Sequence, residues 1–389
     1  MNKDFFEKGI EEIIVQKSFE ERLKSQKLRI KMGFDPTRSD IHLGHAVGLR
    51  KLRELADLGH KIIFLIGDYT TKVGDPSGRN TTRPVLSDAE IKQNAKTYFD
   101  QVGKILDIKK VEVRYNSEWY SKMNFDDILQ LAGKFTVAQI LERDDFTKRL
   151  KTSNDIGLHE LLYPLMQAYD SVILKSDVEF GGSDQKFNML AARGLQKKMG
   201  QTPQDVVTVK LLVGLDGKEK MSKSLDNYIG ISETPESMFG KVMSIPDHLI
   251  IEYFELATDL SDNEVEKIKK ELKDGANPRD IKIKLASAIV ILYHTKKEAL
   301  SAEEKFINRF SKKELPVDIP EIKIPEKNID LLTLITLTDE TLSKSEARRM
   351  IEQGGAKIDG VKITDPVATI GIKKGVIIQL GKLKAYKVK

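Results

Sequence analysis

The sequence predicts an α/β protein with a doubly wound, mostly parallel sheet, followed by a helical domain and a small basic α+β module. Three observations predict this order. Strand-like and helix-like segments alternate up to about residue 230, helical segments alone follow to residue 311, and the last 49 residues carry eleven basic but only four acidic residues. A chain of 389 residues is long enough for two or three domains.

The composition excludes several classes of protein. Hydrophobic residues make up 40% and charged residues 32% of the chain, which is typical of a globular protein and not of a disordered one. Cysteine is absent, so disulfides and cysteine-bound metals are excluded. The acid-rich start has no signal-peptide core, and no segment approaches the ~20 apolar residues of a membrane span. We therefore expect a cytoplasmic protein without a membrane partner.

Short apolar runs and helical segments alternate in the first half. Residues 87–102 predict a helix in which Ser87 and Glu90 form a capping box, and residues 45–58 have helical periodicity. The candidate strands are residues 28–34, 61–66, 111–115 and 206–213. Ligands of doubly wound sheets bind at the carboxyl ends of the strands, so we expect the functional site in the loops that follow these strands.

Helical segments replace this alternation after residue 231. Asp262 is the expected N-cap of one of them, within the start signal SDNE. The expected helices are residues 235–242, 248–258, 262–272, 277–294 and 302–310. Three prolines among alternating charges then make residues 312–329 an extended linker.

Residues 330–389 form the basic module. Ser343 and Glu346 predict a capping box at the start of a short helix, and Asp359 and Gly360 predict a type I′ hairpin. The net charge of the last 49 residues is +7, which leaves −2 for the rest of the chain. This uneven distribution suggests a polyanion as partner, with nucleic acid first, although a solvated lysine-rich end explains the charge equally well.

Two histidines flank a glycine shortly after the first predicted strand, in the motif HLGH at residues 42–45. The helix that begins near Gly44 offers free N–H groups to a phosphate. Gly44 also lets a nucleotide base approach the backbone. His42 and His45 can donate hydrogen bonds to a phosphoryl group as charge builds up on it. The pair favours phosphate chemistry over a simple helix cap.

Two further loops supply cations. The loop that begins with GDPSG carries Arg79 and Arg83, which could hold phosphates, and Asp75, which could bind an ammonium group. The KMSKS motif at residues 220–224 places Lys220 and Lys223 in a mobile loop that suits a triphosphate from which pyrophosphate leaves. Taken alone, each loop also fits an ordinary solvated surface.

A polar stripe lies on a predicted helix, because Tyr163, Gln167 and Asp170 follow the spacing i, i+4, i+7 and share a face. Such a stripe faces solvent or lines a polar pocket. Asp184 and Gln185, in the motif GGSDQ, could bind hydroxyls at another strand end. The chain has no Walker A motif, HExxH motif, zinc-ligand spacing or nucleophile elbow.

Together these motifs resemble those of the class I aminoacyl-tRNA synthetases, and specifically of the bacterial tyrosyl-tRNA synthetases. HLGH is similar to the HIGH signature of the class, and KMSKS matches the second signature in every letter. GFDPT, GDPSG, YxxxQxxD and GGSDQ are similar to motifs of the tyrosyl family and occur in its order. The resemblance covers nearly all of the chain. It implies a Rossmann-like catalytic domain over residues 1–230, a helical anticodon-region domain over 231–311 and an S-four-type RNA-binding domain over 330–389.

The resemblance implies ligation of L-tyrosine to tRNA(Tyr), with ATP as substrate, Mg²⁺ on the nucleotide and no metal bound by the protein. The implied catalytic residues are His42, His45, Lys220, Lys223, Arg79 and Arg83. The implied ATP-binding residues are Asp35, Thr37, Gly44, Met221, Ser222, Ser224 and Asp184. The implied tyrosine-binding residues are Asp75, Thr70, Asn116, Tyr163, Gln167, Asp170 and Gln185. The candidate tRNA-binding residues are Arg348, Arg349, Lys373, Lys374, Lys382 and Lys384.

A homodimer is also implied, with its contact in an insert near residues 115–165. Two positions depart from the family pattern: Lys31 stands where a tyrosine gives a second contact to the phenol OH, and Arg79 stands for a lysine. A tryptophanyl-tRNA synthetase and a non-catalytic RNA-binding protein of synthetase ancestry are the alternatives. GDPSG, GGSDQ and Asp170 favour tyrosine, and intact HLGH and KMSKS motifs argue against loss of catalysis.

Overall fold

The structure is a computed structural model that describes residues 8–37, 40–77, 86–311, 319–326, 328–339, 342–381 and 384–389. The chain divides into two compact units, residues 1–303 and 304–389. No helix within the described ranges is both long and apolar enough to cross a membrane.

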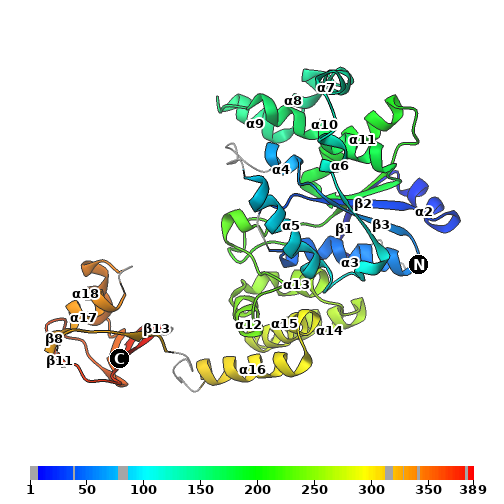
Figure 1. Cartoon of the computed structure of the whole chain (residues 1–389). Coiled ribbons are helices and arrows are strands. Elements are labelled where there is room, and N and C mark those ends of the chain that lie inside the picture. Colours follow the sequence, from blue (N-terminus) through cyan, green and yellow to red (C-terminus); the bar gives the residue numbers. More distant parts are fainter. Residues whose placement is uncertain are drawn as a thin grey trace. The chain divides into compact units, whose positions relative to one another are not determined.

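A six-stranded sheet forms the centre of the first unit, with the strand order β1-β6-β5-β2-β3-β4 (Figure 1). The strands are β1 (Ile10–Ile14), β2 (Arg29–Phe34), β3 (Lys61–Ile66), β4 (Val111–Tyr115), β5 (Val178–Gly182) and β6 (Asp205–Val209). All neighbouring pairs are parallel except β1 and β6, which are antiparallel. The predicted parallel sheet is therefore confirmed. Because β2 pairs with both β3 and β5, the order reverses between β2 and β5, which is where ligands bind in such sheets.

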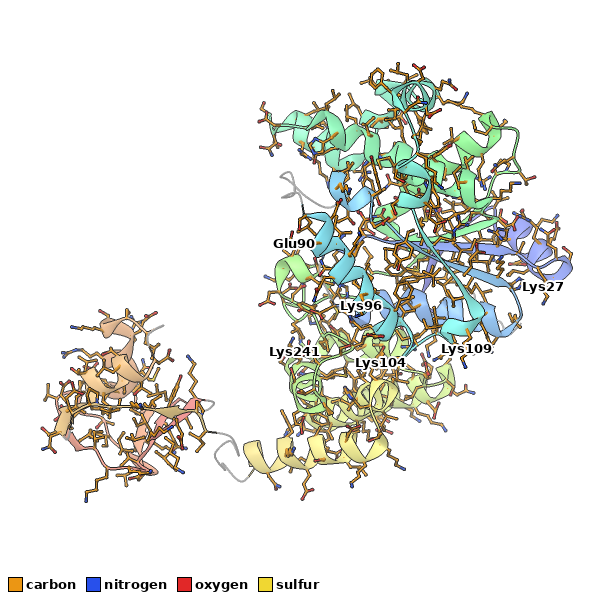
Figure 2. All side chains as sticks on the ribbon, viewed as in Figure 1. Lys27, Glu90, Lys96, Lys104, Lys109 and Lys241 are labelled. Carbon is orange, nitrogen blue, oxygen red and sulfur yellow. The ribbon has the colours of Figure 1, made fainter. Side chains whose placement is uncertain are left out.

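Helices cover both faces of the sheet. The helices α10 (Tyr163–Leu174) and α11 (Lys186–Lys198) lie on one side, and α3 (Leu43–Asp57) lies on the other (Figure 1). The predicted capping box at the start of α5 (Asp88–Val102) is confirmed, since Ser87 and Glu90 exchange hydrogen bonds. Glu90 and Lys96 are exposed on α5 (Figure 2), while Tyr98 is buried on its inner side. The first unit also contains the helices α2 (Gln16–Ser25) and α4 (Thr70–Val73).

An insert of short helices separates β4 from α10. It comprises α6 (Ser117–Tyr120), α7 (Phe125–Ala132), α8 (Val137–Leu141) and α9 (Asp144–Lys151). The insert exposes apolar side chains. No residue of α7 is buried, although more than half of this helix is apolar. Its exposed large apolar side chains are Phe125, Ile128, Leu129, Val137, Leu150 and, just before α10, Leu158.

The segment after residue 231 is helical, as predicted, with α12 (Pro235–Ser244), α13 (Ile250–Ala257), α14 (Asp262–Lys273), α15 (Pro278–Tyr293) and α16 (Lys296–Ser311). Three details of the prediction were wrong. Ser261, not Asp262, caps α14, because Ser261 pairs with Glu264 in a capping box. Helix α16 begins six residues earlier than expected. Strand β6 ends at Val209, because the next apolar residues leave the sheet to bond the KMSKS loop through Leu212.

The second unit is a small α+β structure with its own core around Leu334, Ile335, Ile351 and Ile378. Its helices are α17 (Leu331–Thr338) and α18 (Lys344–Glu352), and its main sheet has the order β10-β9-β12-β13-β7. The strands are β7 (Glu321–Ile322), β8 (Asn328–Asp330), β9 (Ala356–Ile358), β10 (Val361–Lys362), β11 (Thr369–Gly371), β12 (Ile377–Leu380) and β13 (Lys384–Val388).

Two local predictions for this unit are confirmed. Ser343 and Glu346 form the capping box of α18. The two-residue turn between β9 and β10 has positive φ at both Asp359 and Gly360, 45° and 82°, as a type I′ hairpin requires.

Candidate active site

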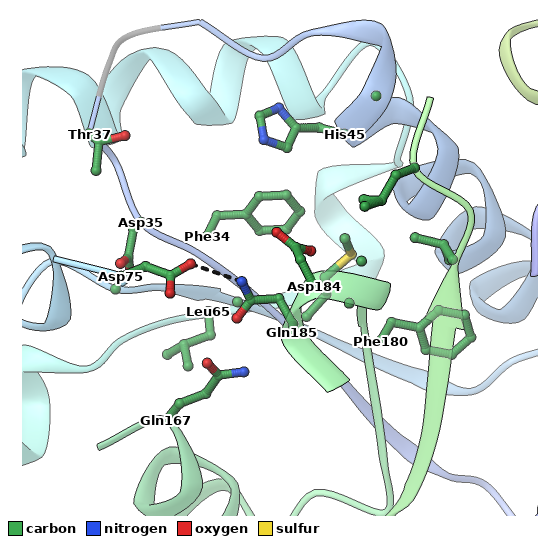
Figure 3. A pocket seen from close by; sticks show the side chains of 18 of the residues that line it. Phe34, Asp35, Thr37, His45, Leu65, Asp75, Gln167, Phe180, Asp184 and Gln185 are labelled. Carbon is green, nitrogen blue, oxygen red and sulfur yellow. Dashed lines mark hydrogen bonds between the residues drawn. The ribbon is translucent and has the colours of Figure 1, made fainter. Parts of the chain in front are cut away.

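A cavity of about 270 Å³ opens at the carboxyl ends of β2, β3, β5 and β6, where the strand order reverses (Figure 3). Phe34 and Asp35 reach it from β2, Leu65 from β3 and Phe180 from β5. The volume is near the lower end of the range for small-molecule sites. The cavity thus lies where we expect the functional site, in the loops after the strands.

The cavity gathers most of the residues that the motifs singled out. Those that line it are Asp35, Thr37, His42, Gly44, His45, Thr70, Asp75, Tyr163, Gln167, Asp170, Asp184, Gln185, Lys220, Met221 and Ser222. Asn116, Lys223 and Ser224 are not among the lining residues. Arg79 and Arg83 lie outside the described residues.

The HLGH segment forms the first turn of α3 at the mouth of the cavity. His42 precedes the helix, and the rings of His42 and His45 stack with their centroids 3.8 Å apart. Burial, followed by the charges of Lys223 and Lys220, lowers the pKa of His42 to about 3. Burial also lowers the pKa of His45 well below its ordinary value. Both imidazoles are therefore neutral hydrogen-bond donors at physiological pH and not cations.

Gly44 is required by the same turn. A Cβ at this position would lie 3.1 Å from two ring atoms of His42 and 3.6 Å from the Cβ of Met221. The segment that follows the KMSKS motif is tied to the start of α3, because the N–H of Leu43 donates to the carbonyl of Ile229 over 3.0 Å.

The two lysines of the KMSKS loop have different partners. Lys220 lines the cavity, and its Nζ lies 2.5 Å from Asp184 Oδ2. Lys223 is buried and donates to the hydroxyl of Tyr98 on α5 over 2.9 Å, with its ammonium 5.0 Å from the centre of that ring. The loop is thus held at both of its cations by groups that border the cavity.

Asp170 is buried at the inner end of the cavity. Its two oxygens accept from Trp119 Nε1 over 3.0 Å and from Asn116 Nδ2 over 3.3 Å. Burial raises the pKa of Asp170 to about 7, although the nearby ammonium of Lys31 and the hydrogen bonds oppose that rise. Burial likewise raises the pKa of Tyr120, with the charge of Asp170 as the next cause. Asp170 can therefore carry a charge that accepts a hydroxyl donor.

A second chain of hydrogen bonds links Asp170 to Asp35, the residue that follows β2. Asn116 Nδ2 also donates to Thr70 Oγ1 over 3.0 Å, and Thr70 Oγ1 donates to Asp35 Oδ1 over 2.8 Å. The hydroxyl of Tyr163 donates to Asp35 Oδ2 over 2.9 Å. Gly67 makes room for this chain, because a Cβ there would collide with Asp35 Oδ1 and Thr70 Oγ1.

Asp75 and Gln185 line the cavity and face each other within hydrogen-bond distance (Figure 3). Gln185 Nε2 donates to Asp75 Oδ2 over 2.8 Å. Behind them lies Arg143, at the start of α9 in the insert, which donates to Ser77 Oγ over 2.9 Å and to Asn188 Oδ1 over 2.7 Å. The motifs gave no signal for Arg143, because it lies far from them in the sequence.

Lys31 and Glu179 form the floor of the cavity. They lie opposite each other in the register of β2 and β5, and Lys31 Nζ is 2.9 Å from Glu179 Oε1. The side chains are 0% and 2% exposed. Glu179 was missed by the sequence reasoning. One signal could have found it, since β2 and β5 are mostly buried strands and each contains one buried charged residue, Lys31 and Glu179, of opposite sign.

The described residues contain no group of three or more histidine, cysteine, aspartate or glutamate side chains that could hold a metal ion. In the second unit, Arg348, Arg349, Lys373 and Lys374 are exposed. Lys384 pairs with the buried Asp339, which raises the pKa of that lysine. Lys382 lies outside the described residues.

Comparison with known proteins decides the family. Residues 23–311 match the family described as tRNA synthetases class I (W and Y). Tyrosine–tRNA ligase 2 of Clostridium acetobutylicum is 52% identical over 387 residues, covering 98% of this chain and 96% of that protein. The tyrosine–tRNA ligase of Thermotoga maritima is 49% identical over 385 residues, covering 98% of this chain and 95% of that protein. The chain belongs to the class I tyrosyl-tRNA synthetases.

Solved tyrosyl-tRNA synthetase structures share the fold of the chain's larger part. A C-terminally truncated mitochondrial enzyme of Aspergillus nidulans superposes with a TM-score of 0.65 at 23% identity, covering 79% of this chain and 93% of that one. An Archaeoglobus fulgidus enzyme in complex with L-tyrosine gives a TM-score of 0.63 at 23% identity, covering 77% of this chain and 98% of that one. The resemblance of the sequence motifs to the tyrosyl-tRNA synthetase family is thus confirmed.

Proposed function

We propose that the chain ligates L-tyrosine to tRNA(Tyr) in two steps. The carboxylate of tyrosine first attacks the α-phosphate of ATP, which gives tyrosyl-adenylate and releases pyrophosphate. A ribose hydroxyl of the 3′-terminal adenosine of the tRNA then attacks the carbonyl of the adenylate and releases AMP. Neither step needs a nucleophile from the protein, so positioning and electrostatic stabilisation carry the catalysis.

The observation that carries this proposal is the cavity itself. It is lined by His42, Gly44, His45 and Lys220 of the two signature motifs and also by Asp75, Gln167 and the buried Asp170. An acyl-nucleotide needs these groups together: donors for phosphate, acceptors for an ammonium group, and an acceptor for a phenol OH. The identity of 52% over nearly the full length of a tyrosine–tRNA ligase supports the same assignment.

The nucleotide would bind at the start of α3, with Asp35, Thr37 and Gly44 near the adenosine and the triphosphate. His42 and His45, as neutral donors, would stabilise the charge that builds up on the α-phosphate. Lys220 and Lys223 would close over the leaving pyrophosphate together with Arg79 and Arg83. Mg²⁺ would enter with the phosphates of ATP, because magnesium usually binds to proteins through the substrate's phosphate oxygens.

Tyrosine would bind with its ammonium group near Asp75, Tyr163 and Gln167 and its phenol near Asp170. Trp119 and Asn116 already donate to Asp170, so the carboxylate is fixed for a third donor. Phenylalanine would leave this buried carboxylate without that donor, and the resulting desolvation cost disfavours it.

Pyrophosphate exchange measured with each of the twenty amino acids tests the proposal. We expect exchange with tyrosine and little with phenylalanine. Faster exchange with tryptophan would instead make the chain a tryptophanyl-tRNA synthetase. Failure with every amino acid would support a non-catalytic RNA-binding protein.

Residues 330–389 are proposed as an S-four-type RNA-binding domain that contacts tRNA phosphates. The exposed Arg348 and Arg349 on α18 and the exposed Lys373 and Lys374 support this role. Reversing the charge of Arg348 and Arg349 is expected to weaken tRNA binding and to reduce its salt dependence, while tyrosine-dependent exchange is unchanged. Unchanged charging at physiological salt would contradict the assignment.

We also propose that the insert forms a homodimer contact. Phe125 and Leu158 are 72% and 80% exposed, and Leu129 and Val137 are further exposed apolar side chains of the insert. A second copy of the chain would cover it. Phe125→Lys combined with Leu158→Lys is expected to give monomers in analytical ultracentrifugation, whereas a wild type that is itself monomeric would contradict the proposal. The cytoplasmic location stays a prediction.

A further inference from the structure

The ion pair of Lys31 and Glu179 is buried, so forming it costs desolvation free energy on folding. Removing two charges from water costs several kcal/mol per ion, and apolar residues of similar volume often replace such pairs without loss of stability. The pair lies directly beneath the cavity that takes the amino acid in the proposed function. Its position therefore suggests a role in binding rather than in folding.

Glu179 connects the sheet to the helix that carries the polar stripe. Its Oε1 accepts from Gln167 Nε2 over 3.0 Å as well as from Lys31, and its Oε2 accepts from Ser171 Oγ over 3.0 Å. Gln204 donates to the same Oε2. Gln167 and Ser171 lie one turn apart on α10, so this one carboxylate fixes two successive turns of the helix.

Lys31 holds the carboxylate in this position. Its ammonium donates to Ser171 Oγ over 2.7 Å and lies 3.4 Å from the carbonyl oxygen of Gln167, in addition to its contact with Glu179. The three hydrogens of the ammonium thus have three acceptors. Lys31 cannot turn toward the cavity without breaking these contacts.

The consequence is a fixed orientation of the Gln167 side-chain amide. Since its nitrogen is bound to Glu179, its oxygen is left as the acceptor, and this oxygen already accepts from Asn188 Nδ2 over 2.9 Å. A carbonyl oxygen has a second lone pair that can accept from the ammonium group of an amino acid. A rotated amide would present its own N–H groups to that ammonium and repel it.

We propose that Lys31 and Glu179 are positioning residues for the amino acid, which orient Gln167 so that its oxygen faces the substrate's ammonium group. The inference rests on the proposed function. It gives a role to Lys31, which departs from the family pattern. Lys31 acts through Glu179 and Gln167 and does not contact the phenol OH.

Three variants separate this role from a purely structural one. Lys31→Met removes the cation, and we expect the KM for tyrosine in pyrophosphate exchange to rise about tenfold to a hundredfold, as for a lost hydrogen bond to a charged group. The double variant Lys31→Met with Glu179→Gln gives Gln167 a neutral acceptor again. Its KM for tyrosine is expected to fall back close to the wild-type value. Lys31→Met with Glu179→Met has neither charge nor acceptor, and its KM for tyrosine should stay high although the protein folds. The KM for ATP should remain within about twofold in all three.

Arg22→Met is the matched control. Arg22 makes a part-buried ion pair with Asp205, at the ends of the strands away from the cavity. The Arg22→Met substitution should lower the midpoint of thermal unfolding while the KM for tyrosine is unchanged. If Lys31→Met does not fold, the two neutral double variants carry the comparison.

The inference is overturned if both double variants have the wild-type KM for tyrosine, or if the KM for tyrosine and the KM for ATP rise together. Failure of the proposed function would look different, because the wild-type protein would then show no tyrosine-dependent exchange at all.

Discussion

The chain's single tryptophan reports directly on the residue proposed to select tyrosine. Trp119 is the one Trp of the sequence, and its indole N–H donates to Asp170 over 3.0 Å. Burial raises the pKa of Asp170 to about 7. Protonation of Asp170 should therefore change the fluorescence of Trp119 near neutral pH. The perturbation is a pH titration of the wild type, with Asp170→Asn as the matched control.

The direction of each effect follows from linkage. A phenol OH that donates to Asp170 stabilises the carboxylate, so saturating tyrosine should move the fluorescence midpoint below 7. Reciprocally, the dissociation constant for tyrosine should rise about tenfold for each pH unit below 7, until the pKa of the complex is reached. Asp170→Asn should show neither the fluorescence transition nor this dependence.

The same group affects stability. The pKa of Asp170 is raised in the folded protein from its ordinary value of 3.8 to about 7, so folding loses stability as pH rises between these values and is insensitive to this group above 7. Each pKa unit corresponds to about 1.4 kcal/mol, which gives a loss of about 4 kcal/mol for wild type relative to Asp170→Asn. Urea unfolding followed by Trp119 fluorescence at several pH values measures this difference.

Two results would refute the reasoning. A fluorescence transition near pH 7 that persists in Asp170→Asn would assign it to another group. A stability difference between the two proteins that stays constant from pH 4 to pH 8 would mean that burial does not raise the pKa of Asp170.

Three further predictions concern other parts of the chain. His45→Ala should slow adenylate formation by about a hundredfold or more while ATP affinity changes little, as for a lost donor to developing charge, and pre-steady-state pyrophosphate release that shows only weaker binding would contradict this. Gly67→Ala should displace Asp35 and Thr70 and lower tyrosine-dependent exchange at least tenfold, with a normal rate arguing against the crowding inferred for that position. Ile351→Ala should cost about 2–5 kcal/mol in the core of the second unit, so that tRNA charging falls while pyrophosphate exchange persists; equal loss of both would show that the first unit depends on the second.

Much of the fold could be predicted from local signals. The strand Lys61–Ile66 is apolar at every position after its first residue, and it was predicted with its observed bounds. The capping boxes of Ser87 with Glu90 and of Ser343 with Glu346 depend on residues three apart, so the sequence contains both partners. Strand β1 was missed because two glutamates interrupt its apolar pattern, and its pairing with β6 joins residues nearly 200 positions apart.

The candidate site was predictable only in part, for the same reason. Motifs identify residues that lie near each other in the sequence, and fifteen of the predicted residues line one cavity in the structure. The residues that orient these side chains have no such signal. Lys31 and Glu179 meet because β2 and β5 are neighbours, and Arg143 reaches Asn188 from a separate insert. Those contacts are set by strand order, which the sequence pattern does not specify.

The polar stripe of α10 illustrates what strand order adds. Helical spacing predicts that Tyr163, Gln167 and Asp170 share a face, but the structure divides them between two hydrogen-bonded networks. Tyr163 and Asp170 belong to one network through Asp35, Thr70 and Asn116. Gln167 belongs to the other, through Glu179 on β5 and Asn188 on α11. Gln167 is therefore oriented by a different part of the sheet edge from Tyr163 and Asp170, and the helical spacing of the three residues does not show this difference.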